Sequence, residues 1–479
     1  MGVLEKLEPQ SVFKFFEEIS QIPHGSNNVD AISDYLVSFA KERELKYIQD
    51  DAKNVIIFGP ASKGYEDRET IILQGHMDMV AVHDADYDVD MKTTPLQLET
   101  DGENIWAKGT SLGGDDGIAV AYCLALLDSK EIPHPPLEVV ITTNEETGMD
   151  GAIAIDLSML KGRKLINLDS ETEGVLLTSC AGGGRFYATL DVNKVHRSGV
   201  LVDVEVSGLV GGHSGTEIIK EHGNANYIAA RTLMEIATKM DVSLKEISGG
   251  VADNAIPIGA KFTIVMLPED LVKLDMVIEW MNKVLKTELE IKDDNVKVTA
   301  TKREEGTFDC FDSKSTTAVY ELMLSLPCGV QAMSATVEGL VETSLNLGVV
   351  TTKENGVVLE YSVRSSIESG KGFLFRKLEI ISKAFGAKTR VAALYPGWPY
   401  KTDSKLREHM VNVYKEMYGH EPKIEALHAG VECGLFSEKV DGLDCISIGP
   451  DMEGVHTTSE KLNVASARRT FEYLCAVLK

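Results

Sequence analysis

The chain has 479 residues, 43% of them hydrophobic and 25% charged, which is the balance of a globular protein with two or three domains. Its formal net charge of −26 repels the phosphates of nucleic acids and anionic lipids. No apolar run approaches the ~18 residues that a membrane-spanning helix needs, and the seven cysteines form no CxxC pair. We therefore expect a cytoplasmic protein with reduced thiols that binds neither nucleic acid nor membranes.

The first part of the chain alternates short apolar strands with helical segments. Strands are predicted at residues 55–58, 70–73, 137–143 and 164–168. Residues 117–127 are apolar on all sides, which is typical of a helix buried on most of its surface. Buried strands separated by helices predict an α/β core with a mostly parallel sheet.

The pattern changes after Ser179. Val202, Val204 and Val206 alternate with acidic residues, which indicates a strand with one wet face. Asn355-Gly356 between two apolar runs is typical of a hairpin turn. These features predict an α+β domain.

The buried pattern returns at residues 391–400, and a strand at 445–448 and a closing helix at 466–478 follow. We therefore predict an α/β catalytic domain, residues 1–184 and 393–479, interrupted by an inserted α+β lid domain, residues 185–392.

Five motifs place metal-ligand side chains directly after apolar runs, and the carboxyl ends of strands in an α/β sheet meet in one crevice. In the first, His76 could bind a metal, and Asp78 lies on the same side of an extended chain, where it could fix the imidazole tautomer. In the second, Gly113 and Gly114 would let the Asp115 carboxylate approach and bridge a cation. The alternatives are an unrelated surface acid beside His76 and an ordinary helix cap at Asp115.

The third motif holds two adjacent glutamates, Glu145 and Glu146, whose mutual repulsion a cation would remove. One could bind metal while the other acts as a base. In a straight strand the two would face opposite sides, so this interpretation requires a bend, which Asn144 and Gly148 permit. The alternative is a solvated acidic turn.

The last two motifs end in Asp169 and His456. Either residue alone is weak evidence, but two histidines and three or four carboxylates can together satisfy two metal ions with a shared water. Nitrogen and oxygen ligands without thiolates favour Zn²⁺, with Co²⁺ or Mn²⁺ as substitutes.

In this order the motifs resemble those of the dinuclear zinc aminoacylase, carboxypeptidase and dipeptidase superfamily, and within it the Xaa-His, or cytosolic non-specific, dipeptidases. The similar stretches run along nearly the whole chain. Besides those above, they lie at residues 211–215, 223–226, 254–257, 364–366, 395–398, 428–434 and 454–456.

The resemblance implies a role for each motif. Asp115 would bridge two metals, with His76 and Asp169 completing one site and Glu146 and His456 the other. Asp78 would orient His76, and Glu145 would be the general base. The implied reaction is hydrolysis of dipeptides, of Xaa-His type or broad specificity including β-alanyl-histidine, by a water between two Zn²⁺ ions. An Asp at position 169 is typical of members that require a free amino terminus.

Four further residues are expected to bind the short peptide substrate. His213, in a glycine-rich turn, could donate to the oxyanion, and Arg364 could grip the terminal carboxylate. Asn254 is a second candidate for carboxylate or carbonyl binding. Glu432 could hold the substrate ammonium or support another site residue.

Other functions remain open at this point. The same scaffold could serve a tripeptidase or an N-acyl amino acid deacylase, and a non-catalytic metal- or peptide-binding module is a third reading. Related enzymes commonly form homodimers through the lid, although an insert of about 200 residues could also suit a monomer.

Overall fold

The computed structural model describes residues 2–335 and 337–479 and divides the chain into two compact units. Unit 1 comprises the chain up to Ser179 together with Tyr400–Ala426 and Val431–Lys479. Unit 2 comprises Cys180–Pro399 and Leu427–Gly430, and the predicted insert falls within it. Each unit has its own hydrophobic core. None of the helices in the described residues has the length and apolarity needed to cross a bilayer.

Unit 1 is built on an eight-stranded sheet of the predicted mixed, centrally parallel kind. Its strands β3, β6, β7 and β21 run parallel, while β1, β2 and β8 are antiparallel to their neighbours. In spatial order the strands are β1 (Lys46–Gln49), β2 (Val55–Gly59), β6 (Leu137–Thr142), β3 (Ile71–His76), β7 (Lys164–Asn167), β21 (Asp444–Ser447), β8 (Val175–Cys180) and β20 (Lys423–Leu427). The parallel centre brings the carboxyl ends of β3, β6, β7 and β21 to one edge.

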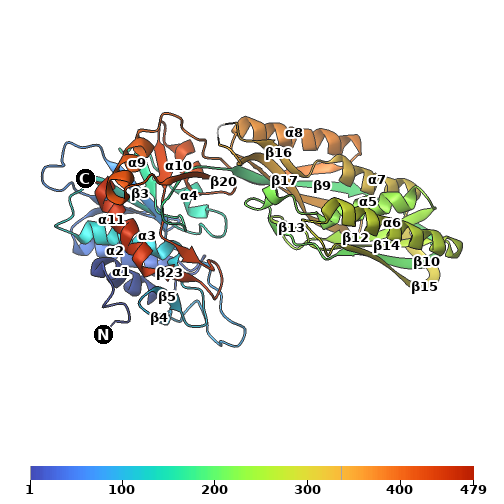
Figure 1. Ribbon diagram of the computed structural model, residues 1–479, viewed down its shortest axis with the longest axis horizontal. Coiled ribbons are helices and arrows are strands. Elements are labelled where there is room, and N and C mark those ends of the chain that lie inside the picture. The colour runs from blue at the N-terminus through green and yellow to red at the C-terminus, as the bar shows by residue number, and fades with distance from the viewer. Residues whose placement is uncertain (1, 336) are drawn as a thin grey trace. The chain divides into compact units, whose positions relative to one another are not determined.

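Helices cover this sheet (Figure 1). They are α1 (Gln10–Ser20), α2 (Asp30–Glu42), α3 (Gly114–Asp128), α4 (Asp150–Ala154), α9 (Lys405–Tyr418), α10 (Cys433–Lys439) and α11 (Val464–Val477). α3 is buried along its length, as its uniformly apolar sequence predicts, and packs against α1 and β3. A smaller sheet orders β22 (Met452–Glu453), β23 (Lys461–Asn463), β5 (Asn104–Ala107) and β4 (Leu98–Thr100).

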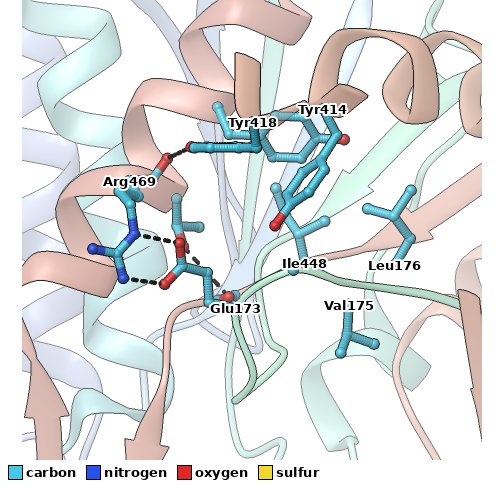
Figure 2. Close-up of a pocket in the computed structure, with 11 residues that line it drawn as sticks. Glu173, Val175, Leu176, Tyr414, Tyr418, Ile448 and Arg469 are labelled. Atoms are coloured by element: carbon cyan, nitrogen blue, oxygen red, sulfur yellow. Dashed lines mark hydrogen bonds and ion pairs between the residues drawn. The ribbon is translucent and has the colours of Figure 1, made fainter. Parts of the chain in front are cut away.

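A small pocket lies between α9, α11 and the start of β8 (Figure 2). Tyr414 and Tyr418 of α9 line it, and Arg469 of α11 pairs with Glu173 at 2.6 Å. Its volume of about 10 Å³ has room for no more than a single water. We therefore regard this pocket as packing between helices and not as a ligand site.

Unit 2 contains a nine-stranded antiparallel sheet with helices on one face (Figure 1). In spatial order its strands are β15 (Lys297–Phe311), β10 (Lys194–Ser207), β14 (Ala260–Met266), β12 (Val242–Gly249), β17 (Val341–Lys353), β18 (Gly356–Ser365), β9 (Gly182–Asp191) and β19 (Lys388–Tyr395), with β16 (Gly329–Met333) beside β17. The helices are α5 (Ala225–Ala237), α6 (Leu271–Leu289), α7 (Ser313–Ser325) and α8 (Glu368–Ala384). The short strands β11 (Gly212–His213) and β13 (Ala255–Ile256) pair separately.

Two predictions for this region are confirmed and one is wrong. Val202, Val204 and Val206 face the core from β10, and Asn355-Gly356 turns β17 into β18. Residues 391–395, in contrast, do not return to the α/β core. They belong to β19, an edge strand of the antiparallel sheet, where Leu394 is 58% exposed. The apolar run at residues 391–394 does not show by itself which sheet it joins, so the sequence could not place it.

Candidate active site

The first candidate ligand, His76, is the last residue of β3 and is 1% exposed. Its Nδ1 lies 2.9 Å from the backbone carbonyl oxygen of Asp78 and 3.5 Å from that residue's Oδ1. Asp78 therefore lies against the ring, and the shorter contact comes from its backbone carbonyl and not from its carboxylate. This arrangement fixes the proton on Nδ1 and leaves Nε2 to face other groups.

The Asp78 carboxylate has partners of its own. Oδ2 accepts from the Ser26 hydroxyl at 2.8 Å, and Oδ1 accepts from the Glu145 N–H at 3.1 Å. Asp78 thus joins three segments that are distant in sequence. Ser26 could not be identified from the sequence, because a single serine in a loop gives no periodic or motif signal.

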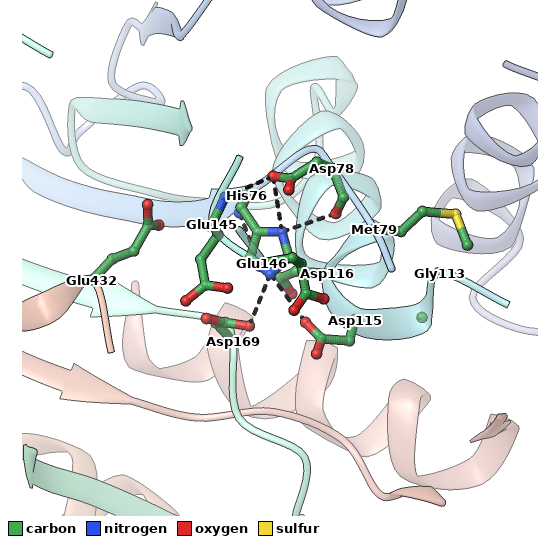
Figure 3. Close-up of polar contacts among 12 residues, drawn as sticks. His76, Asp78, Met79, Gly113, Asp115, Asp116, Glu145, Glu146, Asp169 and Glu432 are labelled. Carbon is green, nitrogen blue, oxygen red and sulfur yellow. Dashed lines mark hydrogen bonds and ion pairs between the residues drawn. The ribbon is translucent and has the colours of Figure 1, made fainter. Parts of the chain in front are cut away.

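The two oxygens of Asp115 face two different imidazoles (Figure 3 draws the Asp115 and His76 side). Oδ1 lies 3.0 Å from His76 Nε2, and Oδ2 lies 3.1 Å from His456 Nε2. His76 Nε2 is also 3.4 Å from Asp169, and His456 Nε2 is 2.9 Å from Glu146. The structure thus groups these five residues into two sets of one imidazole and one carboxylate, with Asp115 common to both.

This donor set fits a pair of divalent cations. One ligand atom each from His76, Asp115 and Glu146 lies within 4.8 Å of the others, and the same holds for His76, Asp116 and Asp169. Burial raises the pKa of Asp169 well above its ordinary value, and the Asp115 charge adds to this shift. Burial lowers the pKa of His76, but the carboxylates of Asp169 and Asp115 outweigh it, so the pKa lies well above its ordinary value. Both shifts express a local excess of negative charge that cations would balance.

Asp116 was not assigned a role from the sequence. Its side chain is fully buried, and Oδ2 accepts the His76 backbone N–H at 3.1 Å. Oδ1 has no hydrogen-bond partner among the described residues. Asp116 therefore supports the backbone of the first histidine and lies beside Asp169, as Figure 3 shows.

The predicted bend at the two glutamates is present. β6 ends at Thr142, and Asn144 and Met149 have φ values of 54° and 61°, with Gly148 at 142°. This left-handed turn lets Glu146 contact His456 while Glu145 stays beside the Asp169 carboxylate. Burial, with help from Asp169 and against His76, raises the pKa of Glu145 to about 8. A carboxyl group with such a pKa has the proton affinity that a general base needs.

Glu432 lies directly before α10 and is completely buried. One oxygen accepts from the Gln74 amide and from the Thr142 hydroxyl at 2.7 Å. The other oxygen has no partner among the described residues. Burial and the neighbouring Glu145 raise the pKa of Glu432 to about 8.

The remaining candidates lie in unit 2. Arg364 alternates on β18 with the core residue Val363, so it points to the sheet face opposite the helices. Its guanidinium is largely buried, donates to the Tyr395 hydroxyl at 3.0 Å and lies 3.5 Å from His213 Nε2. Its Nε lacks a partner among the described residues. Arg364 and His213 are thus neighbours, and the Arg364 Nε–H group has no acceptor among the described residues.

Two more residues complete this cluster. Buried His428 contacts the Ser344 hydroxyl at 2.7 Å, and Ser344 pairs with Arg364 across the sheet. Asn254 is exposed and lies one residue before the strand that pairs with His213; its carbonyl accepts the Ser214 N–H at 2.7 Å. His428 lies within one of the motifs that carry the resemblance, but no function was expected of it from the sequence.

An open cavity of about 860 Å³ in unit 1 reaches one of the metal-ligand candidates, Glu146. Glu146 and Thr147 line one side of it. The other walls come from the segments 25–28, 79–83 and 89–92. This volume is in the range of small-molecule sites, so it can accommodate part of a short peptide.

Comparison with known proteins agrees with this geometry. Residues 72–479 match the model of peptidase family M20/M25/M40. The cytosol non-specific dipeptidase of Escherichia coli (strain K12) is 36% identical over 481 residues, covering 100% of this chain and 99% of that protein. The crystal structure of aminoacylhistidine dipeptidase from Vibrio alginolyticus superimposes with a TM-score of 0.90 at 37% identity, covering 99% of this chain and 97% of the other. Aminopeptidase PepT from Bacillus cereus shares the fold, with a TM-score of 0.57 at 16% identity over 98% of each chain. The resemblance inferred from the motifs is thereby confirmed, and the chain belongs to peptidase family M20/M25/M40.

Proposed function

We propose that this protein is a metal-dependent dipeptidase that cleaves Xaa-His or a broad range of dipeptides, β-alanyl-histidine among them. The observation that carries the proposal is the position of Asp115, which presents one oxygen to each of two histidines. This is the arrangement that a carboxylate bridging two cations requires. The names of the two relatives of 36% and 37% identity support dipeptides as the substrate class.

The proposed cofactor is a pair of Zn²⁺ ions, with Co²⁺ or Mn²⁺ as substitutes. His76 and Asp169 would hold one ion, His456 and Glu146 the other, and Asp115 both. When bound, such a pair lowers the pKa of a water and polarises the scissile carbonyl.

The protein's own groups would then move the proton. We propose that Glu145 accepts a proton from the attacking water and transfers it to the leaving amine. Its partly buried position beside the Asp169 carboxylate and next to the candidate ligand Glu146 supports this role. Asp78 would keep His76 in one tautomer throughout.

Substrate binding is assigned to the remaining candidates. Arg364 would bind the terminal carboxylate with the donor capacity that its present contacts leave unused. His213 would donate to the oxyanion, and Asn254 would bind a carbonyl or carboxylate oxygen. For Glu432 the unpartnered oxygen favours contact with the substrate ammonium, whereas its complete burial favours a supporting role.

The decisive experiment combines metal analysis with a substrate panel. We expect two divalent ions per chain and rapid cleavage of dipeptides with free termini. Preference for tripeptides or N-acyl amino acids would replace the proposal with a tripeptidase or a deacylase. Full activity in chelator would refute the metal mechanism, and metal binding without turnover would indicate a non-catalytic module.

We also propose a cytoplasmic location, which the name of the Escherichia coli relative supports.

We further propose a homodimer formed through unit 2. Val272, Met276 and Trp280 lie four residues apart on α6 and are 70%, 67% and 43% exposed, which gives this helix an apolar stripe. Sedimentation analysis of the wild type and of Met276→Glu tests the dimer. A monomeric wild type would contradict it.

A further inference from the structure

Glu460 is a buried acid that neither the motifs nor the proposed reaction uses. It lies in the loop between β22 and β23, four residues after His456, and is 3% exposed. The loop is tightly folded, because the Thr457 N–H donates to the Gly454 carbonyl and the Glu460 N–H donates to the Thr457 carbonyl. β23 then continues into the pairing with β5, which anchors the backbone directly after Glu460.

The Glu460 carboxylate is held by four consecutive backbone N–H groups of the segment that carries Asp115. Oε2 accepts from Leu112 at 2.8 Å and Gly113 at 3.1 Å, and Oε1 accepts from Gly114 at 2.8 Å and Asp115 at 3.4 Å. Four backbone amides thus converge on this carboxylate, as in an anion-binding nest.

The glycines before α3 gain an explanation from this contact. A Cβ added to Gly114 would lie 3.2 Å from Glu460 Oε1 and 3.1 Å from the Met452 sulfur, which is closer than most such contacts. The carboxylate that approaches the glycine segment most closely is thus that of Glu460, from the other end of the chain. It occupies the N–H groups that would otherwise oppose a cation at this helix start.

We propose that Glu460 is a positioning residue that locks the Asp115 and His456 segments together and so sets the spacing between the two halves of the metal centre. The inference rests on the proposed function, because Asp115 and His456 are its assumed ligands. Glu460 is four residues from His456 and contacts the Asp115 N–H, so one side chain connects ligands 341 residues apart in the chain. The hydrogen bonds that its carboxylate accepts in the described residues all come from backbone N–H groups, so it acts through the backbone.

The test compares two buried glutamates that both bind backbone N–H groups. Glu138, at the start of β6, is also 3% exposed and accepts from Lys161 and Gly162, at the opposite end of the strand from Glu145. Metal-free wild type, Glu460→Gln and Glu138→Gln are titrated with Co²⁺ and followed by visible absorbance. In Glu460→Gln the amide NH₂ faces backbone donors, so we expect Co²⁺ affinity and kcat to fall about 10- to 100-fold with KM nearly unchanged. In Glu138→Gln only thermal stability should fall.

Glu460 would be merely structural if Glu460→Gln bound Co²⁺ with the wild-type affinity and spectrum, or if Glu138→Gln lost as much affinity. Should Glu460→Gln fail to fold, Gly114→Ala decides, because its added methyl group displaces the same carboxylate by only a few tenths of an ångström. A weakened Co²⁺ affinity in Gly114→Ala supports the proposal, and wild-type affinity overturns it. A wild type that binds Co²⁺ but cleaves no dipeptide would refute the proposed function and leave this inference standing.

Discussion

At the scale of single residues, Glu145 allows a test of whether metal binding and proton transfer belong to different side chains. It lies beside Glu146 in the turn after β6, and Glu146 contacts His456 at 2.9 Å. We predict that Glu145→Ala keeps two metal ions per chain and loses a factor of about 10² to 10⁴ in kcat, the usual contribution of a general base. Elemental analysis and dipeptide hydrolysis on the same preparation measure both. Parallel loss of metal would instead make Glu145 a ligand.

Arg364 allows a test of the substrate carboxylate. If its guanidinium binds that group, amidating the carboxyl terminus of a dipeptide removes the favourable charge contact in the wild type. We predict that amidation lowers kcat/KM more in the wild type than in Arg364→Ala, which has already lost the contact. Equal losses in the two proteins would remove this role from Arg364.

His428 makes unit 2 sensitive to acid. Burial, together with the positive charge of Arg364 and the nearby His213, lowers the pKa of this imidazole to about 3. An unfolded histidine has a pKa of about 6.5, so between these values the unfolded chain binds a proton that the folded chain does not. Unfolding free energy therefore falls as the pH drops below about 6.5, whereas above it the neutral ring carries no such penalty.

We predict that the wild type loses about 2 kcal/mol more than His428→Gln between pH 7.5 and pH 5.0, since one pKa unit corresponds to about 1.4 kcal/mol. Urea denaturation at both pH values measures the difference. Equal losses in both proteins would show that His428 is protonated without penalty in the folded chain. Glutamine is a suitable replacement because it can still hydrogen-bond the Ser344 hydroxyl.

At the scale of elements, the end of α4 depends on a lysine from another helix. The Lys439 ammonium, at the end of α10, donates to the carbonyls of Ala152, Ile153 and Ile155 at 2.7 to 2.8 Å. These carbonyls are the groups that a helix leaves without partners at its carboxyl terminus. The contact therefore holds α4, which follows the glutamate turn, against α10.

We predict that Lys439→Met lowers the free energy of unfolding by about 1 kcal/mol, because charged caps at helix ends contribute about that much. The matched control is Lys283→Met, which breaks an exposed pair with Glu279 on α6 and should lower the free energy of unfolding much less. Urea denaturation compares the two variants. If Lys283→Met lowered the free energy of unfolding as much as Lys439→Met, the contact between Lys439 and the α4 carbonyls would stabilise the chain no more than an exposed ion pair does.

Elements with a uniformly apolar or a strictly alternating sequence could be predicted. The uniformly apolar residues 117–127 form most of α3, and the alternating valines form β10. The glutamate turn was predictable for another reason: two adjacent acids could not both face a site from a straight strand, and Asn144 and Gly148 tolerate the left-handed backbone.

Features that depend on contacts between distant segments could not be predicted. Glu460 is a single acid in a loop, and only the folded chain brings it to the amides of residues 112–115. The same holds for His428 and Ser344, which belong to different parts of the sequence. Composition alone also could not assign β19, because its apolar run does not show which sheet it joins.

At the scale of the whole molecule, the candidate ligands belong to one of two independent cores. His76, Asp115, Glu146, Asp169 and His456 all lie in unit 1. Arg364 and His213 lie in unit 2, whose core is formed by its own sheet and helices. Stabilisation by metal should therefore act on unit 1 and leave the core of unit 2 unchanged.

We predict that chelation accelerates amide hydrogen exchange in α3 and in the turn after β6, because removing the cations leaves several buried carboxylates to repel one another. Exchange in β12 and β14 of unit 2 should stay the same, and adding Zn²⁺ should restore the original rates in unit 1. Mass spectrometry of peptides from the intact chain measures all of these segments in one experiment. Acceleration in both units alike would mean that the metal stabilises the whole chain as one cooperative body, and unchanged rates everywhere would mean that no metal contributes to the fold of unit 1.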